Sequence, residues 1–102
     1  MAEITVDTKK KLVLVSGRAH PALAEGVASE LGIELTGSDL RTFANGEIYA
    51  RYDTSIRGAD VFVLQSHTAP INEWVMETLI MIDALKRASA KRITVVAPFF
   101  PY

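Results

Sequence analysis

Residues 12–17 read Leu-Val-Leu-Val-Ser-Gly, a continuous apolar run that ends at a glycine. Strands buried on both faces of a parallel sheet have such unbroken runs, whereas half-exposed strands alternate between apolar and polar residues. Residues 61–65 (Val-Phe-Val-Leu-Gln) and 93–97 (Ile-Thr-Val-Val-Ala) have the same character. The three runs predict a mainly parallel sheet with helices on both faces, an α/β fold.

Two helices are expected between these strands. The first begins at Pro21, where a missing N–H costs least, and ends at Gly32, a typical residue just past a helix end. Its apolar residues recur every fourth position from Leu23 to Leu31. The second helix is predicted over residues 71–88.

A different pattern occupies the middle of the chain. Asn45-Gly46 lies between the β-prone segments 41–44 and 47–52, and Asn-Gly in that setting is the strongest short signal for a β-hairpin. A further short strand is predicted at residues 33–36. The expected order is therefore strand–helix–strand, hairpin, strand–helix–strand.

The second predicted helix has more apolar surface than one contact with a sheet would cover. At about 100° per residue, one half of the helical wheel is polar and the other apolar. The polar half contains Asn72, Glu73, Glu77, Asp83, Lys86 and Arg87. The apolar half contains Trp74, Met81, Ile82, Leu85 and Ala88.

Met76, Ile80 and Ala84 lie among the polar residues of this helix and form an apolar stripe. Either a part of the protein outside this chain packs on this stripe, or it is a subunit interface, which we favour because exposed apolar surface usually marks an interaction site.

Composition narrows the function classes. The net charge of −1, from 11 basic and 12 acidic residues, gives no electrostatic signal for nucleic acid or an anionic membrane. No apolar run is long enough to predict a membrane span. The absence of cysteine excludes disulfides and thiolate catalysis, and we expect a cytoplasmic protein.

The residues alone predict a ligand edge but no catalytic residue. Ligands of open parallel sheets bind beyond the carboxyl ends of the strands, and helix N-termini there favour phosphate. The Walker, dinucleotide and nucleophile-elbow motifs are absent from this sequence. His20 and His67 are interpreted as structural, and two distant histidines without paired carboxylates predict no metal site. From the pattern alone, Phe43 and Glu47 are hairpin residues.

The segment 41–48, Arg-Thr-Phe-Ala-Asn-Gly-Glu-Ile, resembles the adenine-side motif of ribose-phosphate pyrophosphokinases, the phosphoribosyl pyrophosphate synthetases. Further segments resemble this family in the same order: residues 16–21, 55–58, 64–67, 72–77, 79–86, 88–94 and 98–102. The resemblance extends from about Leu12 to Tyr102. It implies a phosphoribosyltransferase-like fold that is incomplete here, with residues 1–102 forming part of the family's N-terminal domain.

The resemblance implies a reaction and its ligands. Enzymes of this family transfer diphosphate from Mg-ATP to the 1-hydroxyl of ribose 5-phosphate for nucleotide biosynthesis. By resemblance, Phe43 stacks on adenine, and Asn45, Gly46 and Glu47 belong to the same ATP-binding motif. This motif serves the ATP site of a neighbouring subunit in the family, which implies a homo-oligomer.

The resemblance also implies an allosteric site. Many members bind phosphate or ADP between subunits, and the matching positions here are Ser55, Arg57 and Ser89. Hydroxyl and guanidinium groups suit phosphate oxygens. The alternative is that these residues only form a turn and a helix end.

Important parts of the family pattern are not in this sequence. In the family, the segment after Phe-Pro-Tyr completes the ATP site, and the magnesium histidine, the catalytic loop and the ribose-phosphate loop lie further on. We therefore expect this chain alone to be inactive, with Mg²⁺ ligands outside it. The alternative is a free-standing, non-catalytic assembly or regulatory module of the same fold. The reading frame after the Tyr102 codon distinguishes the two.

Overall fold

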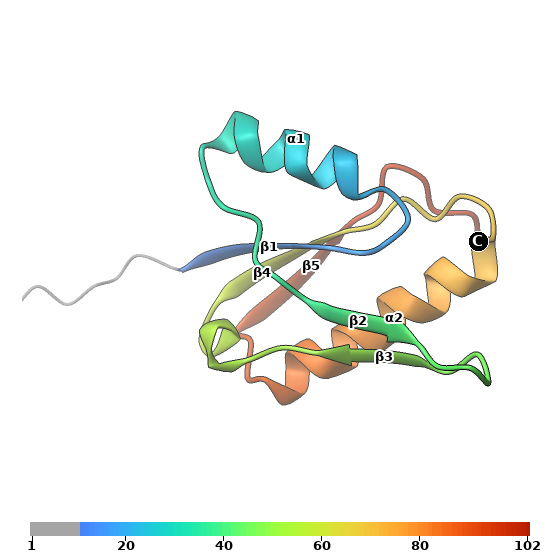
Figure 1. Cartoon of the computed structure of the whole chain (residues 1–102). Helices are drawn as coiled ribbons and strands as arrows, with labels where there is room; N and C mark the ends of the chain where they lie inside the picture. Colours follow the sequence, from blue (N-terminus) through green and yellow to red (C-terminus); the bar gives the residue numbers. More distant parts are fainter. Residues whose placement is uncertain (1–10) are drawn as a thin grey trace, which may run out of the picture.

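The computed structural model of the chain describes residues 11–102 and places there two helices and five strands, one strand fewer than predicted (Figure 1). The elements are β1 (Leu12–Ser16), α1 (Pro21–Leu31), β2 (Asp39–Thr42), β3 (Ile48–Arg51), the 3₁₀ turn η1 (Thr54–Ile56), β4 (Asp60–Leu64), α2 (Ile71–Arg87) and β5 (Arg92–Val96). The first ten residues lie outside the described residues.

The three apolar runs form a parallel sheet in the order β1-β4-β5, which confirms the predicted fold class. The register aligns the strand ends, because Ser16 pairs with Leu64 and Leu64 pairs with Val96. The loops that leave the three strands therefore start at one edge of the sheet. The backbone bond from Gly17 N to Leu64 O, 3.0 Å long, holds the first two loops together.

The helices cover opposite faces of this sheet (Figure 1). Side chains alternate along each strand, so β1 turns Leu14 towards α1 and its neighbours Val13 and Val15 towards α2. The core on the α1 side contains Leu14, Ala24, Ala28 and Leu64. The larger core on the α2 side contains Val13, Val15, Ile56, Ala59, Val61, Val63, Met81 and Leu85.

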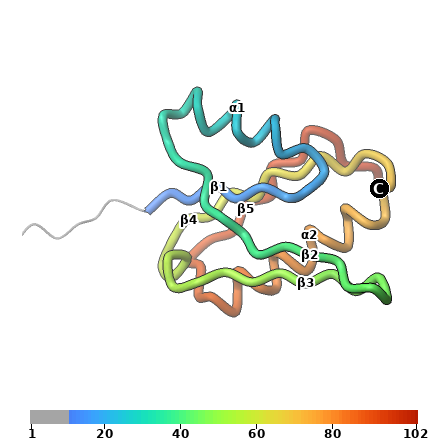
Figure 2. Tube along the Cα trace, in the orientation of Figure 1, coloured from blue at the N-terminus to red at the C-terminus, as the bar shows by residue number. Residues whose placement is uncertain are grey.

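Strands β2 and β3 form the predicted hairpin, which is a separate antiparallel sheet. The hydrogen bonds from Phe43 N to Glu47 O (2.8 Å) and from Gly46 N to Phe43 O (2.9 Å) close the turn. Gly46 has φ of 94°, a conformation that a glycine adopts without steric cost. Leu40 and Ala50 pack against the core on the α2 side. The trace of the hairpin accordingly runs alongside α2 (Figure 2).

The prediction of an extended strand at residues 33–36 is wrong. Only Leu35 makes a bridge, to Leu14 of β1, and Thr36 N donates to Leu14 O at 2.9 Å. The chain then leaves β1 for the hairpin, so the segment is too short to form a ladder.

The prediction from the helical wheel of α2 is wrong for one residue. Glu77, assigned to the polar half, is fully buried with an exposed fraction of 0%. The other residues of the polar half are exposed. Partners far away in the sequence cause this difference, since they satisfy the carboxylate inside the protein.

We expect Gly17→Ala to destabilise the fold. A Cβ at Gly17 would lie 2.1 Å from Cδ of Gln65, whose side chain is buried and hydrogen-bonded. Overpacking of this kind costs about 1–3 kcal/mol, which urea unfolding measures as a lower midpoint.

Gly26→Ala is the matched control for that substitution. Gly26 lies inside α1 with nothing within 4 Å of its added Cβ, so alanine should raise stability by about 0.5–1 kcal/mol. A Gly17→Ala midpoint equal to that of the wild type would mean that Gln65 moves aside at no cost.

Candidate functional site

The hairpin tip presents polar and aromatic side chains to the solvent. Asn45 Nδ2 donates to Glu47 Oε1 at 2.6 Å, and Glu47 N donates to Asn45 Oδ1 at 3.1 Å. Phe43 is 46% exposed. The structure thus brings the four ATP-binding residues predicted by resemblance, Phe43, Asn45, Gly46 and Glu47, onto one turn.

Phe43 belongs to a larger aromatic face of the hairpin. Its ring lies 5.8 Å from that of Tyr49, with an interplanar angle of 52°. The guanidinium of Arg41 lies 4.9 Å from the centre of the Tyr49 ring, within range of a cation–π contact. Hydrogen bonding to Asp39 raises the pKa of Arg41 above its ordinary value, so the guanidinium group keeps its positive charge.

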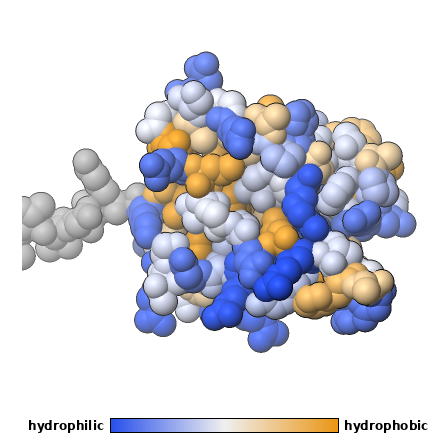
Figure 3. All heavy atoms as spheres, in the orientation of Figure 1, coloured by the Kyte–Doolittle hydropathy of each residue, from blue (hydrophilic) through white to orange (hydrophobic). Residues whose placement is uncertain are grey.

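Sequence reasoning missed Arg41 and Tyr49. Arg41 lies two residues before Phe43 on β2, and Tyr49 pairs with Arg41 across the hairpin. Residues two apart on a strand and directly opposite across a ladder share a face. The strand pattern around the Asn-Gly turn therefore contained a signal for both residues. In Figure 3, apolar residues gather at the end of the molecule where the hairpin tip lies, with hydrophilic residues beside them.

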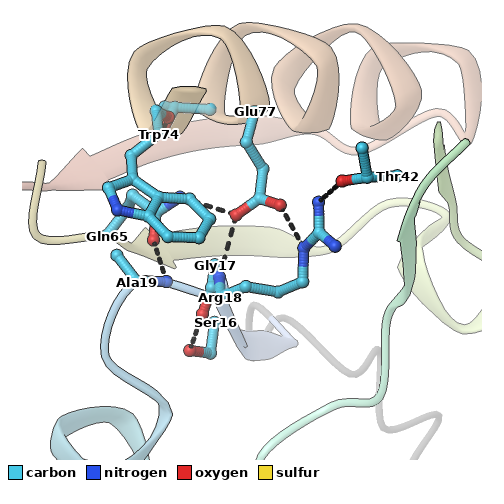
Figure 4. A network of polar contacts seen from close by, with 9 residues as sticks. Ser16, Gly17, Arg18, Ala19, Thr42, Gln65, Trp74 and Glu77 are labelled. Carbon is cyan, nitrogen blue, oxygen red and sulfur yellow. Dashed lines mark hydrogen bonds and ion pairs between the residues drawn. The ribbon is translucent and has the colours of Figure 1, made fainter. Parts of the chain in front are cut away.

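A buried network lies behind the hairpin, at the carboxyl ends of β1 and β4 (Figure 4). Glu77 of α2 accepts from Arg18 N (2.8 Å), Arg18 Nε (2.5 Å) and Gln65 Nε2 (2.8 Å). Gln65 Oε1 accepts from Ala19 N at 3.1 Å. Arg18 also reaches the hairpin, because its Nη2 donates to Thr42 Oγ1 at 2.8 Å.

A second polar site lies at the other end of β3. Arg57 and Ser89, two of the three predicted allosteric residues, line a cavity of about 360 Å³. The third, Ser55, does not line the cavity, but its N–H donates to Asp53 at 2.9 Å and so fixes η1. Sequence reasoning missed two more arginines of the same cavity, Arg51 and Arg87.

The backbone at this second site adopts an uncommon conformation. Ser89 has φ of 66°, the only positive φ of a non-glycine residue in the part of the chain that the structure describes. Ser89 O accepts from Gly58 N at 2.9 Å, which fixes the end of α2 to η1. Hydrogen bonding by Ser55 lowers the pKa of Asp53. The cavity therefore combines three guanidinium groups with one carboxylate.

The predicted apolar stripe is only partly exposed. Met76 is 51% exposed, whereas Ile80 and Ala84 are half-buried. Ala84 borders a cavity of about 200 Å³ together with Ala50 and other residues of the hairpin side. Leu79, which sequence reasoning did not include, is 56% exposed on the same helix.

Both histidines have structural contacts. His20 caps α1 by accepting from Leu23 N at 3.3 Å, and the buried His67 lies between Thr78 Oγ1 (2.8 Å) and Phe99 O (3.1 Å). Among residues 11–102, no three His, Cys, Asp or Glu side chains gather as a metal site would require. No helix in that range has the length and apolarity to cross a membrane.

Comparisons with known proteins identify the family of this chain. A family profile described as the N-terminal domain of ribose phosphate pyrophosphokinase matches residues 12–102. The ribose-phosphate pyrophosphokinase of Corynebacterium glutamicum is 64% identical over 94 residues, which are 92% of this chain and 29% of that protein. That of Mycobacterium tuberculosis strain H37Rv is 61% identical over all 102 residues, or 31% of its own length.

A solved structure gives the same result. The crystal structure of phosphoribosylpyrophosphate synthetase from Mycobacterium smegmatis matches 91% of this chain with a TM-score of 0.87 and 63% sequence identity, covering 31% of that chain. The chain thus spans about a third or less of the proteins that it matches. The resemblance found in the sequence is confirmed, and the chain belongs to the ribose-phosphate pyrophosphokinase family, whose N-terminal domain it matches.

Proposed function

We propose that this chain supplies the adenine-recognising part of the ATP site in an enzyme that makes phosphoribosyl pyrophosphate. The observation that carries the proposal is the hairpin tip, where an exposed aromatic ring and a fixed carboxylate lie on one turn. In the proposed reaction, the 1-hydroxyl of ribose 5-phosphate attacks the β-phosphorus of Mg-ATP. A new oxygen–phosphorus bond forms there, and AMP leaves.

The tip has the groups that adenine recognition needs. Phe43 offers a free ring face, and stacking a base on an aromatic ring contributes about 1–3 kcal/mol. Asn45 holds one carboxylate oxygen of Glu47, which leaves acceptor capacity for the exocyclic amine of adenine. Guanine carries an oxygen at that position and would meet the carboxylate with another acceptor.

The remaining parts of the reaction are assigned outside residues 11–102. Phosphoryl transfer depends on positioned cations and charge stabilisation, and the described residues contain no cluster of metal-ligating side chains. We therefore assign no catalytic residue here, and Mg²⁺ enters the proposal as part of the Mg-ATP substrate. A cytoplasmic location fits a chain without cysteine.

ATP should perturb the backbone amide signals of residues 43–47 in an NMR titration of the chain. Phe43→Ala should weaken this binding about 5- to 150-fold, the equivalent of one lost stacking contact. GTP should bind more weakly than ATP, because Glu47 has no amine to accept from at the corresponding position.

Leu31→Ala is the control, since Leu31 is 61% exposed at the end of α1 and lies outside the hairpin. It should leave ATP binding unchanged. The proposal fails if ATP leaves the hairpin amides unshifted, or if Phe43→Ala binds ATP as the wild type does.

We further propose that the cavity beside η1 binds phosphate or the phosphates of ADP. Arg51, Arg57 and Arg87 line it together with Ser89, and guanidinium groups form strong charge-assisted hydrogen bonds with phosphate oxygens. Their charge exceeds that of Asp53, the one carboxylate in the lining.

Inorganic phosphate should raise the thermal unfolding midpoint of the chain, because a ligand of the folded state stabilises it. Arg57→Ala should remove most of this increase. Arg92→Ala replaces an arginine that is not part of the cavity lining, and this variant should keep the increase in the unfolding midpoint. Equal responses of the two variants would exclude a specific site.

We also propose that the apolar stripe of α2 lies in a homo-oligomer interface. Met76 and Leu79 are each more than half exposed, and apolar side chains gathered on one helix usually become buried in an assembly. A partner subunit would also supply a second wall for the solvent-exposed ring of Phe43.

Ile80→Glu should convert the assembly to monomers in analytical ultracentrifugation, because a buried interface does not accommodate an unpaired charge. Lys86→Glu changes an exposed residue of the same helix and should leave the assembly intact. A monomeric wild type, or an Ile80→Glu variant of unchanged mass, would assign the stripe to packing with another part of the protein.

A further inference from the structure

We propose that Arg18 is a positioning residue that holds the hairpin through Thr42, with Glu77 as its fixed anchor. The importance of this position for nucleotide binding rests on the function proposed above. The restraint of the hairpin by Arg18 is argued from the contacts alone.

The anchor is a buried carboxylate with several donors. Glu77 has an exposed fraction of 0% and accepts from Arg18 N, Arg18 Nε and Gln65 Nε2 at 2.5–2.8 Å. A buried carboxylate with so many donors has little freedom to move, because each displacement leaves a buried group without its partner.

Gln65 stiffens this anchor from the other side. Its side chain is 1% exposed, and its two polar atoms join Glu77 to the backbone N–H of Ala19. Gly17 leaves the space that this side chain occupies. The loop after β1 is therefore joined to α2 directly at Arg18 N and, through Gln65, at Ala19 N.

Arg18 extends from the anchor to the hairpin. Its Nε donates to Glu77, and its Nη2 donates to Thr42 Oγ1 at 2.8 Å (Figure 4). The guanidinium group is planar and its donors have fixed directions, so the carboxylate determines where Nη2 points. A lysine would offer one ammonium group and no such rigid fork.

The bond to Thr42 is the one hydrogen bond between residues 39–51 and the other described residues. The hairpin has no ladder bonds with the parallel sheet; it otherwise rests on apolar packing, including Leu40 and Ala50 against the core. Apolar contacts are not directional, whereas a hydrogen bond is. Arg18 therefore supplies a directional restraint that the packing lacks.

Thr42 directly precedes Phe43. Because side chains alternate along a strand, a threonine held towards Arg18 turns the next ring to the opposite face of β2, where it meets Tyr49. The packing of Leu40, two residues earlier, already sets this face, and the bond to Thr42 restrains the orientation in which the hairpin presents the ring.

The experiment compares amide hydrogen exchange of Thr42→Val, Arg18→Lys and the double variant in the 102-residue chain without nucleotide. Each single variant should speed exchange of the Phe43 and Gly46 amides about three- to tenfold, the effect of one lost hydrogen bond. The amides of β4 should keep their rates in Thr42→Val, whereas Arg18→Lys also removes the Nε bond to the buried Glu77 and should speed exchange in the core as well. The double variant should exchange no faster at the hairpin than Arg18→Lys alone, because the bond that Thr42→Val removes is already lost there.

Two controls separate positioning from general stability. Thr94→Val changes another exposed strand threonine and should leave the hairpin amides unchanged. The fluorescence of the chain's single tryptophan, Trp74 of α2, should also stay unchanged in Thr42→Val. Unchanged hairpin exchange in Thr42→Val, or additive effects in the double variant, would overturn the inference. Equal acceleration in the hairpin and the core of Thr42→Val would also overturn it, because it would indicate only a general loss of stability.

ATP titration then separates the two proposals. Thr42→Val should weaken ATP binding about three- to tenfold while keeping the preference for ATP over GTP, since the groups that contact the base remain. If the wild type binds no ATP but the exchange pattern is as expected, the proposed function fails and the positioning role stands. If ATP affinity is unchanged in a variant whose hairpin has loosened, position does not control nucleotide binding.

Discussion

The fold depends on how Glu77 is accommodated in the interior. A carboxylate taken out of water loses several kcal/mol of hydration, which only close donors and an opposite charge offset. Here Arg18 and Gln65 supply those donors, and each comes from the loop after a different strand of the parallel sheet. Satisfying one buried group therefore brings the ends of β1 and β4 against α2. The same interaction selects the packing of α2, because a rotated helix would leave the carboxylate buried without its donors.

Elements specified by neighbouring residues were predictable from the sequence. The strands were visible as unbroken apolar runs, and the hairpin followed from Asn45-Gly46, since Gly46 adopts the positive φ that the turn requires. Gly32 ends α1 with φ of 66°, as its position predicted. The hairpin-tip residues could also be selected, though only by resemblance, because an aromatic ring and a carboxylate beside a turn indicate no particular ligand.

Features set by contacts between distant residues were not predictable from periodicity. Glu77 lies 59 positions from Arg18, and a helical wheel places any glutamate with the polar residues. The short strand expected at residues 33–36 failed for a related reason, since a strand exists only as far as its partner runs alongside it. Arg51 and Arg87 approach each other only because the hairpin packs on α2. In each case the information lies in the tertiary arrangement.

The hairpin shows how a segment can be both exposed and well placed. Its tip is exposed, so it can reach a ligand or another subunit, but exposed β-hairpins are marginally stable by themselves. Packing of Leu40 and Ala50 fixes the height of the hairpin above the core, and a directional bond is still needed to fix its rotation. The surplus donor of a guanidinium already held by a buried carboxylate is suited to that purpose, because it is rigid without belonging to the hairpin. The charge that organises the interior can thereby also orient an aromatic ring at the surface.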